Sequence, residues 1–306
     1  MHLVTVDGTP RPWVGALAGT HVVDLAAAAQ AVGGGPAPAL ATMLDLVRAG
    51  AAGLAAARAA LAHAQTALGR DAAGAERQGL ARPRNQVRLL APIPRPAKNI
   101  VCLGRNYAEH AAERGSAAPT IPVYFTKPHT TVIGPEAEII YHRCTQQLDY
   151  EVELAVVIGA GGRNIPKERA LSHVFGYTIM NDVTARDLQK AHTQWFKGKS
   201  LDTFGPLGPA IVTADEVPDP QRLRVTLRVN GQVRQSAGTD TMLFDVVTCI
   251  AVLSEGLTLE PGDLIATGTP AGVGAATDGL LKVGDVVEAE VTGFGVLRNT
   301  VVADRG

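Results

Sequence analysis

The stretch LDYEVELAVVIG, residues 148–159, constrains this chain most, because it predicts a strand that carries two acids on one face. Alternate side chains of a strand point the same way, so Glu151 and Glu153 share a face and lie about 7 Å apart. The opposite face is an unbroken apolar row: Val152, Leu154, Val156 and Ile158. We expect this row to face the core, while the repulsion between the two carboxylates needs compensation.

A second segment, FGYTIMNDVTARD, predicts another strand over about 174–180 that ends at Asn181 and Asp182. If this strand lies beside the first, Asp182 joins Glu151 and Glu153. Three carboxylates form the hard, incompletely filled oxygen shell that Mg²⁺ or Mn²⁺ prefers. The alternative is that the two glutamates face solvent on an amphipathic strand, and for an E-x-E pair taken alone that is the better explanation.

The segment GRNYAEHAAERG, residues 104–115, predicts a short helix with Asn106 as N-cap and Gly115 just past its end. His110 and Glu113 then lie three residues apart on one face. A carboxylate in that place orients an imidazole and raises its basicity, as a general base acting on water requires. An ordinary surface pair is the alternative.

Two further segments are rich in glycine. In QWFKGKSLDTFGPLGP, residues 194–209, a phosphate loop is excluded because Thr193 stands where that motif needs glycine. Lys199 either neutralises an oxyanion or is simply solvated. In TGTPAGVG, residues 267–274, backbone N–H groups and the Thr269 hydroxyl either reach a substrate carboxylate or form a plain turn.

The chain divides into two regions near residue 90. Residues 1–90 combine short strands with Ala-rich helices, whereas 91–306 is mostly β with Gly/Pro turns. The proline-rich segment APIPRPAKN, 91–99, marks the boundary, because proline continues neither a helix nor a central strand. In the second region we expect a hairpin turn at Asn230–Gly231 and a helix over about 241–255 that begins at Asp240 or Thr241. The fold class is α+β, mostly β.

Charge and composition limit the classes of partner that the protein can be expected to bind. The 28 Lys and Arg residues nearly balance 29 Asp and Glu residues, so nothing favours nucleic acid or an anionic membrane. No stretch approaches the roughly 20 apolar residues of a membrane span, and no leader pattern begins the chain. Three distant cysteines fit reduced core thiols. We expect a cytoplasmic protein that binds a small molecule.

Together these segments resemble the signature segments of the fumarylacetoacetate hydrolase family, over roughly residues 95–302. In order they are GRNYAEHAAE, FTKP, LDYEVELAVVIG, NDVTARDLQ, GKSLDTFGPLGP, TGTPAGVG and LRNTV. The resemblance implies a mixed β-sandwich roll, preceded by a small N-terminal α/β domain, and a homodimer.

The resemblance also implies roles for individual residues. It makes Glu151, Glu153 and Asp182 ligands of Mg²⁺ or Mn²⁺, and it makes His110 with Glu113 a water-activating pair on a mobile lid. Lys199 becomes the cation beside the oxyanion. Four residues are expected to contact the substrate: Arg105, Lys127, Gln189 and Thr269. Two residues depart from the family pattern, Val152 in place of a frequent Gly and Leu201 in place of a frequent Phe.

The chemistry that follows is enolate chemistry on a 2-oxo acid, in which a divalent cation stabilises the negative charge. We expect a hydrolase that cleaves the C–C bond of a 2,4-dioxo acid, such as fumarylacetoacetate or another acylpyruvate. The alternative is an isomerase or decarboxylase that acts on a 2-hydroxy-diene or 2-oxo-ene dioate, or on oxaloacetate, in aromatic catabolism. A second alternative is a metal-binding β protein without turnover.

Overall fold

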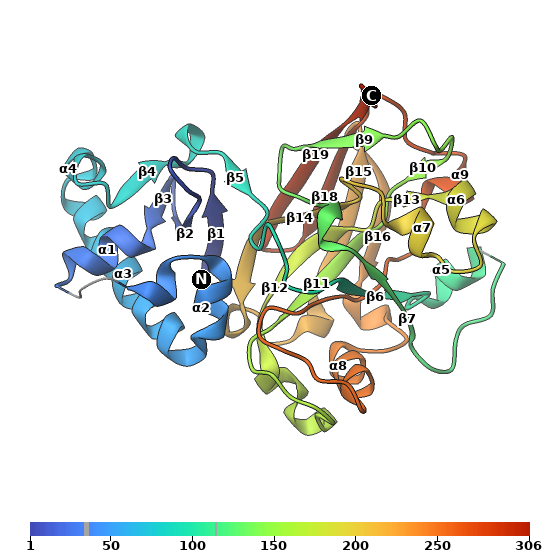
Figure 1. The fold of residues 1–306 in the computed structure, drawn as a ribbon, viewed down its shortest axis with the longest axis horizontal. Coiled ribbons are helices and arrows are strands. Elements are labelled where there is room, and N and C mark those ends of the chain that lie inside the picture. Colours follow the sequence, from blue (N-terminus) through green and yellow to red (C-terminus); the bar gives the residue numbers. More distant parts are fainter. Residues whose placement is uncertain (34–36, 114) are drawn as a thin grey trace.

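The computed structural model describes residues 1–33, 37–113 and 115–306 (Figure 1). In this part of the chain, no helix combines the length and the apolar character that crossing a membrane requires. Helices and strands are interspersed along the chain, and the strands form three sheets.

The largest sheet has twelve strands, in the order β4-β3-β2-β1-β14-β12-β11-β17-β6-β7, with β5 beside β1 and β8 beside β14. Its strands are β1 (His2–Val6), β2 (Trp13–Ala18), β3 (His21–Asp24), β4 (Ala81–Pro83), β5 (Leu89–Leu90), β6 (Ile100–Gly104), β7 (Val123–Lys127), β8 (Val132–Ile133), β11 (Val152–Ile158), β12 (Val174–Asn181), β14 (Gly205–Thr213) and β17 (Leu264–Ala266).

A five-stranded sheet has the order β16-β15-β18-β19-β9, and β10 pairs with β13 alone. These strands are β9 (Glu138–Tyr141), β10 (Leu148–Asp149), β13 (Thr184–Ala185), β15 (Arg224–Val229), β16 (Gln232–Gly238), β18 (Val286–Val291) and β19 (Gly295–Ala303). The expected hairpin joins β15 to β16, and Asn230 and Gly231 both have positive φ, as a type I′ turn requires.

The α-helices fall into two groups (Figure 1). Those of the N-terminal region are α1 (Leu25–Ala31), α2 (Met43–Arg48), α3 (Gly50–Arg70) and α4 (Ala72–Arg77). Those of the rest are α5 (Ala108–Glu113), α6 (Arg186–Ala191), α7 (Phe196–Lys199), α8 (Val246–Ser254) and α9 (Gly274–Thr277). In Figure 1, α5, α6, α7 and α9 gather at one end of the large sheet. Short 3₁₀ helices cover Pro38–Leu40, Arg84–Gln86, His129–Thr131, Lys167–His173, Ala214–Glu216, Pro220–Arg222 and Thr239–Thr241.

Two hydrophobic cores lie on opposite faces of the large sheet. The first contains the apolar row of β11 and side chains of the five-stranded sheet, such as Val225 and Val287. The second contains Ala155 and Val157 of β11 together with buried residues of helices α1, α2 and α3. The buried face of α3 consists of small residues, Gly53, Ala57, Ala60 and Ala64, as expected from its Ala-rich sequence. The molecule is therefore layered, with helices, large sheet and small sheet in turn.

Strand β11 corrects one expectation. We expected only the apolar row to face a core, but every residue from Val152 to Ile158 is buried. The row that begins with Glu153 continues into the second core, because the N-terminal helices cover that side of the sheet. The acids are thus confined to the end of a strand that is buried on both faces, which is the position in which an uncompensated carboxylate costs most.

Two helix starts also differ from expectation. Helix α8 begins at Val246 with Asp245 as N-cap, because its side chain accepts the Thr248 N–H at 2.7 Å. The earlier residues Thr239–Thr241 form a separate 3₁₀ turn. Asn106 does not cap α5; its side chain bonds the backbone of Phe244 instead.

The N-terminal region joins the large sheet, since β1 pairs with β14 through His2↔Val212 and Leu3↔Ile211. The division into domains near residue 90 stays a prediction. The cysteines are free, as expected, but only Cys102 and Cys249 lie in the core, whereas Cys144 is exposed.

Candidate active site

Strands β11 and β12 bring the three predicted metal ligands together. The strands are antiparallel neighbours with Val152 opposite Asn181, so Glu151 and Asp182 both lie just beyond the pairing. The Asp182 N–H donates to the Glu151 carbonyl at 2.8 Å. Carboxylate oxygens of Glu151, Glu153 and Asp182 lie within 4.8 Å of one another, and all three residues are buried. The predicted neighbourhood of the two strands is confirmed.

Buried cations surround two of these acids. The Lys199 ammonium lies 2.6 Å from Glu151 Oε2 and 2.6 Å from Asp182 Oδ2. Lys127 Nζ lies 2.5 Å from the other Asp182 oxygen, and Arg186 Nη2 lies 2.6 Å from Glu151 Oε1. The lysines come from α7 and β7, and the arginine begins α6. Lys199 therefore bridges two carboxylates that lie at the ends of two different strands.

These charges separate the pKa values of the glutamates. Burial alone would raise the pKa of Glu151, but Lys199 and Arg186 lower it well below its usual range. Burial, Asp182 and Glu151 raise the pKa of Glu153, because like charges and a low dielectric disfavour its ionised form.

The acids fit a divalent cation. Within the described ranges, Glu153 has no Lys or Arg in ion-pair contact; its Oε2 accepts the Gly268 N–H at 2.8 Å. A buried carboxylate without a cation partner is costly, and a carboxylate oxygen retains lone pairs for a second partner. A cation bound by these three oxygens would complete the compensation that the lysines and Arg186 leave partial.

The predicted pair His110 and Glu113 forms on α5. His110 Nδ1 lies 2.8 Å from Glu113 Oε1, and His110 is 7% exposed. The Nδ1–H group donates to the carboxylate when the imidazole is neutral, which leaves Nε2 as the acceptor. Gly115 ends the helix with positive φ, as expected, and Ser116 N donates to the Ala111 carbonyl at 2.9 Å.

The loop after β17 binds carboxylates of the protein itself. Gly268 N–H donates to Glu153, and Gly272 N–H donates to Glu113 Oε2 at 2.9 Å. Glu113 thus joins His110 through one oxygen and this loop through the other. Two explanations were open for TGTPAGVG, and neither described this use of its N–H groups. The loop binds both Glu153 and the carboxylate partner of His110.

One cavity of about 410 Å³ contains most of the predicted site, with His110, Glu151, Glu153 and Lys199 in its wall. Three of the predicted substrate contacts also line it: Arg105, Gln189 and Thr269. Thr269 is fixed by Gln235, whose Nε2 donates to its hydroxyl at 2.8 Å. Lys127 is fully buried and bonds Asp182 and the Val183 carbonyl, so the structure places it behind Asp182. Its contact with substrate stays a prediction.

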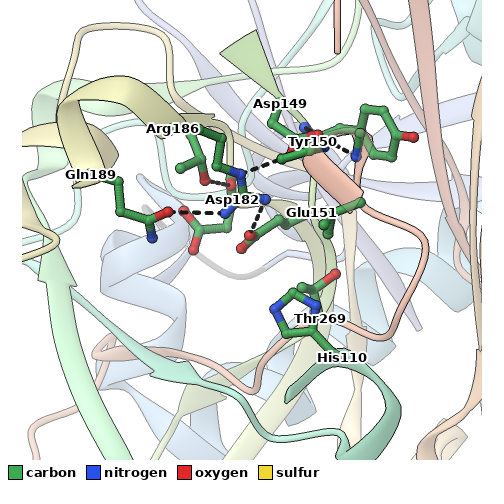
Figure 2. Close-up of polar contacts among 12 residues, drawn as sticks. His110, Asp149, Tyr150, Glu151, Asp182, Arg186, Gln189 and Thr269 are labelled. Atoms are coloured by element: carbon green, nitrogen blue, oxygen red, sulfur yellow. Dashed lines mark hydrogen bonds and ion pairs between the residues drawn. The ribbon is translucent and has the colours of Figure 1, made fainter. Parts of the chain in front are cut away.

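Arg186 and Asp149 belong to the site, although the sequence reasoning did not select them (Figure 2). Arg186 Nε lies 2.7 Å from Asp149 Oδ2, and its Nη1 donates to Gln189 Oε1 at 3.2 Å. Asp149 is fully buried and also accepts the N–H groups of Gly274 and Ala275, at 2.7 and 3.0 Å. The signal for Asp149 was present, because it precedes Glu151 by two residues in the same alternation. A single arginine in the segment after a predicted strand gives no comparable signal.

The two departures from the family pattern lie outside the acid cluster. Val152 is fully buried in the first core, on the face of β11 away from the acids. Leu201 lies in the same core, two residues after Lys199. Neither side chain contributes a polar atom to the site.

Comparisons with known proteins agree on one family. Residues 99–302 match the model of the fumarylacetoacetate (FAA) hydrolase C-terminal family. Oxaloacetate tautomerase YisK of Bacillus subtilis is 51% identical over 223 residues, 71% of this chain and 74% of that protein.

Two solved structures match nearly the whole chain. A fumarylacetoacetate hydrolase from Exiguobacterium antarcticum superposes with a TM-score of 0.80 at 40% identity and covers 99% of this chain and 100% of its own. A 2-hydroxyhepta-2,4-diene-1,7-dioate isomerase from Mycobacterium marinum gives 0.73 at 31% identity and covers both chains fully. With its mixed fold, acid cluster and ordered motifs, the chain belongs to the fumarylacetoacetate hydrolase family.

Proposed function

We propose that the protein is a divalent-metal-dependent tautomerase that interconverts the keto and enol forms of a 2-oxo dicarboxylic acid, with oxaloacetate as the first candidate. The observation that carries the proposal is the 51% identity to a protein named oxaloacetate tautomerase, over a stretch that makes up 71% of this chain. This supports the alternative drawn from the sequence better than C–C bond hydrolysis.

The chain's own residues supply what the reaction needs. A keto–enol interconversion moves one proton between a carbon and an oxygen, so one positioned base suffices. His110 provides it, with Nδ1 bonded to Glu113 and Nε2 as the free acceptor. Glu113 keeps the ring oriented because its second oxygen is held by Gly272 N–H.

The acid cluster would stabilise the negative charge that develops when the base removes a proton. Mg²⁺ or Mn²⁺ held by Glu151, Glu153 and Asp182 would act as a Lewis acid toward the carboxylate and keto oxygens of the substrate. Lys199 stays protonated, because Asp182 and Glu151 raise its pKa although burial opposes this. Its ammonium adds positive charge beside the position where the enolate oxygen forms.

Hydrolysis of a 2,4-dioxo acid is the second candidate, favoured by the complete His110–Glu113 pair. It requires in addition a water molecule that attacks a second carbonyl group of the substrate. Decarboxylation requires neither this water molecule nor the second carbonyl group. A homodimer, which the resemblance implies, stays a prediction.

One assay separates these reactions. Metal-loaded protein is mixed with enol-oxaloacetate and, separately, with an acylpyruvate, and ultraviolet absorbance and products are followed with and without EDTA. We expect accelerated decay of the enol without loss of CO₂, abolished by EDTA. Metal alone is the first control, and His63→Ala, on α3, is the second. Enol decay at the rate of metal alone, together with cleavage of the acylpyruvate, would show that the protein is a hydrolase instead.

A further inference from the structure

Arg105 brings to the cavity a positive charge that has no acidic partner. It lines the same cavity as the metal-binding acids. The buried cations of the cavity wall, Lys199 and Arg186, are each in contact with carboxylates. Arg105 is half-buried, and Lys190, the other cation of the wall, is exposed to solvent. Over the ranges that the structure describes, no carboxylate lies within ion-pair distance of the Arg105 guanidinium, which lies 5.3 Å from the ring centroid of Trp195. This guanidinium is therefore available to an anion that a ligand brings.

The backbone at Arg105 is held in an unusual conformation. Its φ is +57°, in the left-handed region that a non-glycine residue rarely adopts. The next residue, Asn106, is fully buried and fixes the turn, since its Nδ2 donates to the Thr267 carbonyl at 2.7 Å and to the Phe244 carbonyl at 2.9 Å. Strain of this kind persists where surrounding contacts determine the conformation, and it concentrates at functional sites. Here it sets the direction in which the Arg105 side chain leaves β6.

The Arg105 guanidinium lies over the indole ring of Trp195. The indole packs directly on Gly104, where any Cβ would collide with the ring. Phe125 meets it edge-on, with centroids 5.5 Å apart and planes at 74°. A guanidinium placed over the face of an indole retains N–H donors for a carboxylate, and a fork of two donors matches the two oxygens. Gly104, Phe125 and Trp195 therefore hold Arg105 ready to accept an anion.

Two parts of the cavity wall suit the two ends of one ligand. The acid cluster and its cation suit the 2-oxo acid end, whereas the free guanidinium suits a second carboxylate. We propose that Arg105, stacked on Trp195, binds the second carboxylate of a 2-oxo dicarboxylic acid and selects such acids over monocarboxylic ones. This rests on the proposed function, which it deepens by naming the residues that recognise the substrate's other end.

The test measures binding without turnover. Malate and lactate share a 2-hydroxy acid end and differ by the second carboxylate, and oxalate presents only the metal-binding end. Each is titrated into the Mg²⁺-loaded protein by calorimetry, for wild type, Arg105→Met, Arg105→Lys and Trp195→Leu. The matched control is Arg82→Met, because Arg82 also stacks on a tryptophan, Trp13, at 5.9 Å, outside the cavity.

In the wild type we expect malate to bind more tightly than lactate by roughly 10- to 100-fold, the range of a charge-assisted contact. Arg105→Met should remove this preference and leave oxalate affinity unchanged. Arg105→Lys should retain part of it, since a point charge replaces the fork. Trp195→Leu should weaken malate more than oxalate, and Arg82→Met should change neither.

The outcomes distinguish this proposal from the proposed function. An unchanged preference for malate in Arg105→Met, with the variant folded by circular dichroism, overturns the proposal. An equal loss of oxalate and malate affinity also overturns it, because the arginine would then act on the metal-binding end. If the preference depends on Arg105 but no tautomerase activity is found, the subsite stands and the proposed reaction falls.

Discussion

Glu153 is the residue whose charge depends most on a cation. Glu151 and Asp182 are neutralised by lysines and Arg186, whereas among the described residues Glu153 has the Gly268 N–H and no Lys or Arg partner. Its raised pKa, caused by burial, Asp182 and Glu151, means that the folded metal-free protein binds a proton there more tightly than the unfolded chain does. For this group, stability is fully present below the unfolded pKa and is lost as pH rises through the higher folded pKa.

This predicts how metal binding depends on pH. A cation must displace the Glu153 proton, so apparent Mg²⁺ affinity should rise with pH, by up to about tenfold per unit below the folded pKa, and binding should release a proton. Calorimetry in two buffers of different ionisation enthalpy counts the released protons. The control is Glu153→Gln, which should bind Mg²⁺ more weakly and release none. An affinity independent of pH from mildly acidic to neutral solution would mean that Glu153 is already ionised.

The sequence predicted the site residues whose positions follow from the alternation of side chains along a strand. Glu151 and Glu153 follow from the two-residue period of a strand, and Asp182 follows from the end of the next strand. Arg186 did not follow, because its importance depends on Asp149 and Glu151, which meet it only in the folded chain.

The element that unites the site is the loop from Thr267 into α9. Its N–H groups bind Glu153, Glu113 and Asp149, so one segment positions a predicted metal ligand, the partner of His110 and the anchor of Arg186. Gly272 has a φ of +103°, and a Cβ there would collide with the Arg234 carbonyl. The loop therefore requires glycine at this position for two separate reasons.

Replacing Gly272 tests this requirement. Gly272→Ala should lower the free energy of unfolding by roughly 1–3 kcal/mol, from backbone strain and the collision together. It should also lower kcat, because the bond to Glu113 is disturbed. Gly284→Ala is the matched control: its φ is +95° but open space surrounds it, so only strain of about 1 kcal/mol is expected. Equal losses in urea unfolding for the two variants would contradict the close packing inferred at Gly272.

The elements themselves were predicted well where periodicity or turn chemistry was strong, as in β11, α3 and the Asn230–Gly231 hairpin. The start of α8 was misplaced by several residues, because Asp240 and Asp245 are both acceptable N-caps. Tertiary contacts decide between them: Gln221 Oε1 accepts the Val246 N–H at 3.0 Å and fixes the start there.

In the whole molecule, the N-terminal region and the rest share the large sheet and the second core. Leu3, Leu46 and Val47 pack in the same cluster as Ile211 and Leu264. Sequence composition located a boundary near residue 90 but gave no sign of this shared core, because pairing between distant strands such as β1 and β14 leaves no local pattern.

Removing residues 1–90 tests how far the two regions depend on each other. The remaining chain would expose Ile211, Phe175 and other residues of the second core, so we expect a markedly lower thermal midpoint and a tendency to aggregate. The full chain at the same concentration is the reference, followed by circular dichroism and light scattering. An unchanged midpoint would instead show that residues 91–306 fold as an independent domain.

The most direct test of the proposed reaction follows the C3 protons of oxaloacetate in D₂O by NMR. The Mg²⁺-loaded wild type should accelerate their exchange for deuterium while the carbon skeleton stays intact. His110→Ala should bind Mg²⁺ as the wild type does but exchange roughly 10²-fold more slowly, the scale of a lost general base. Exchange no faster than with Mg²⁺ alone, or conversion to pyruvate and CO₂ at the same rate as exchange, would contradict the assignment of a tautomerase.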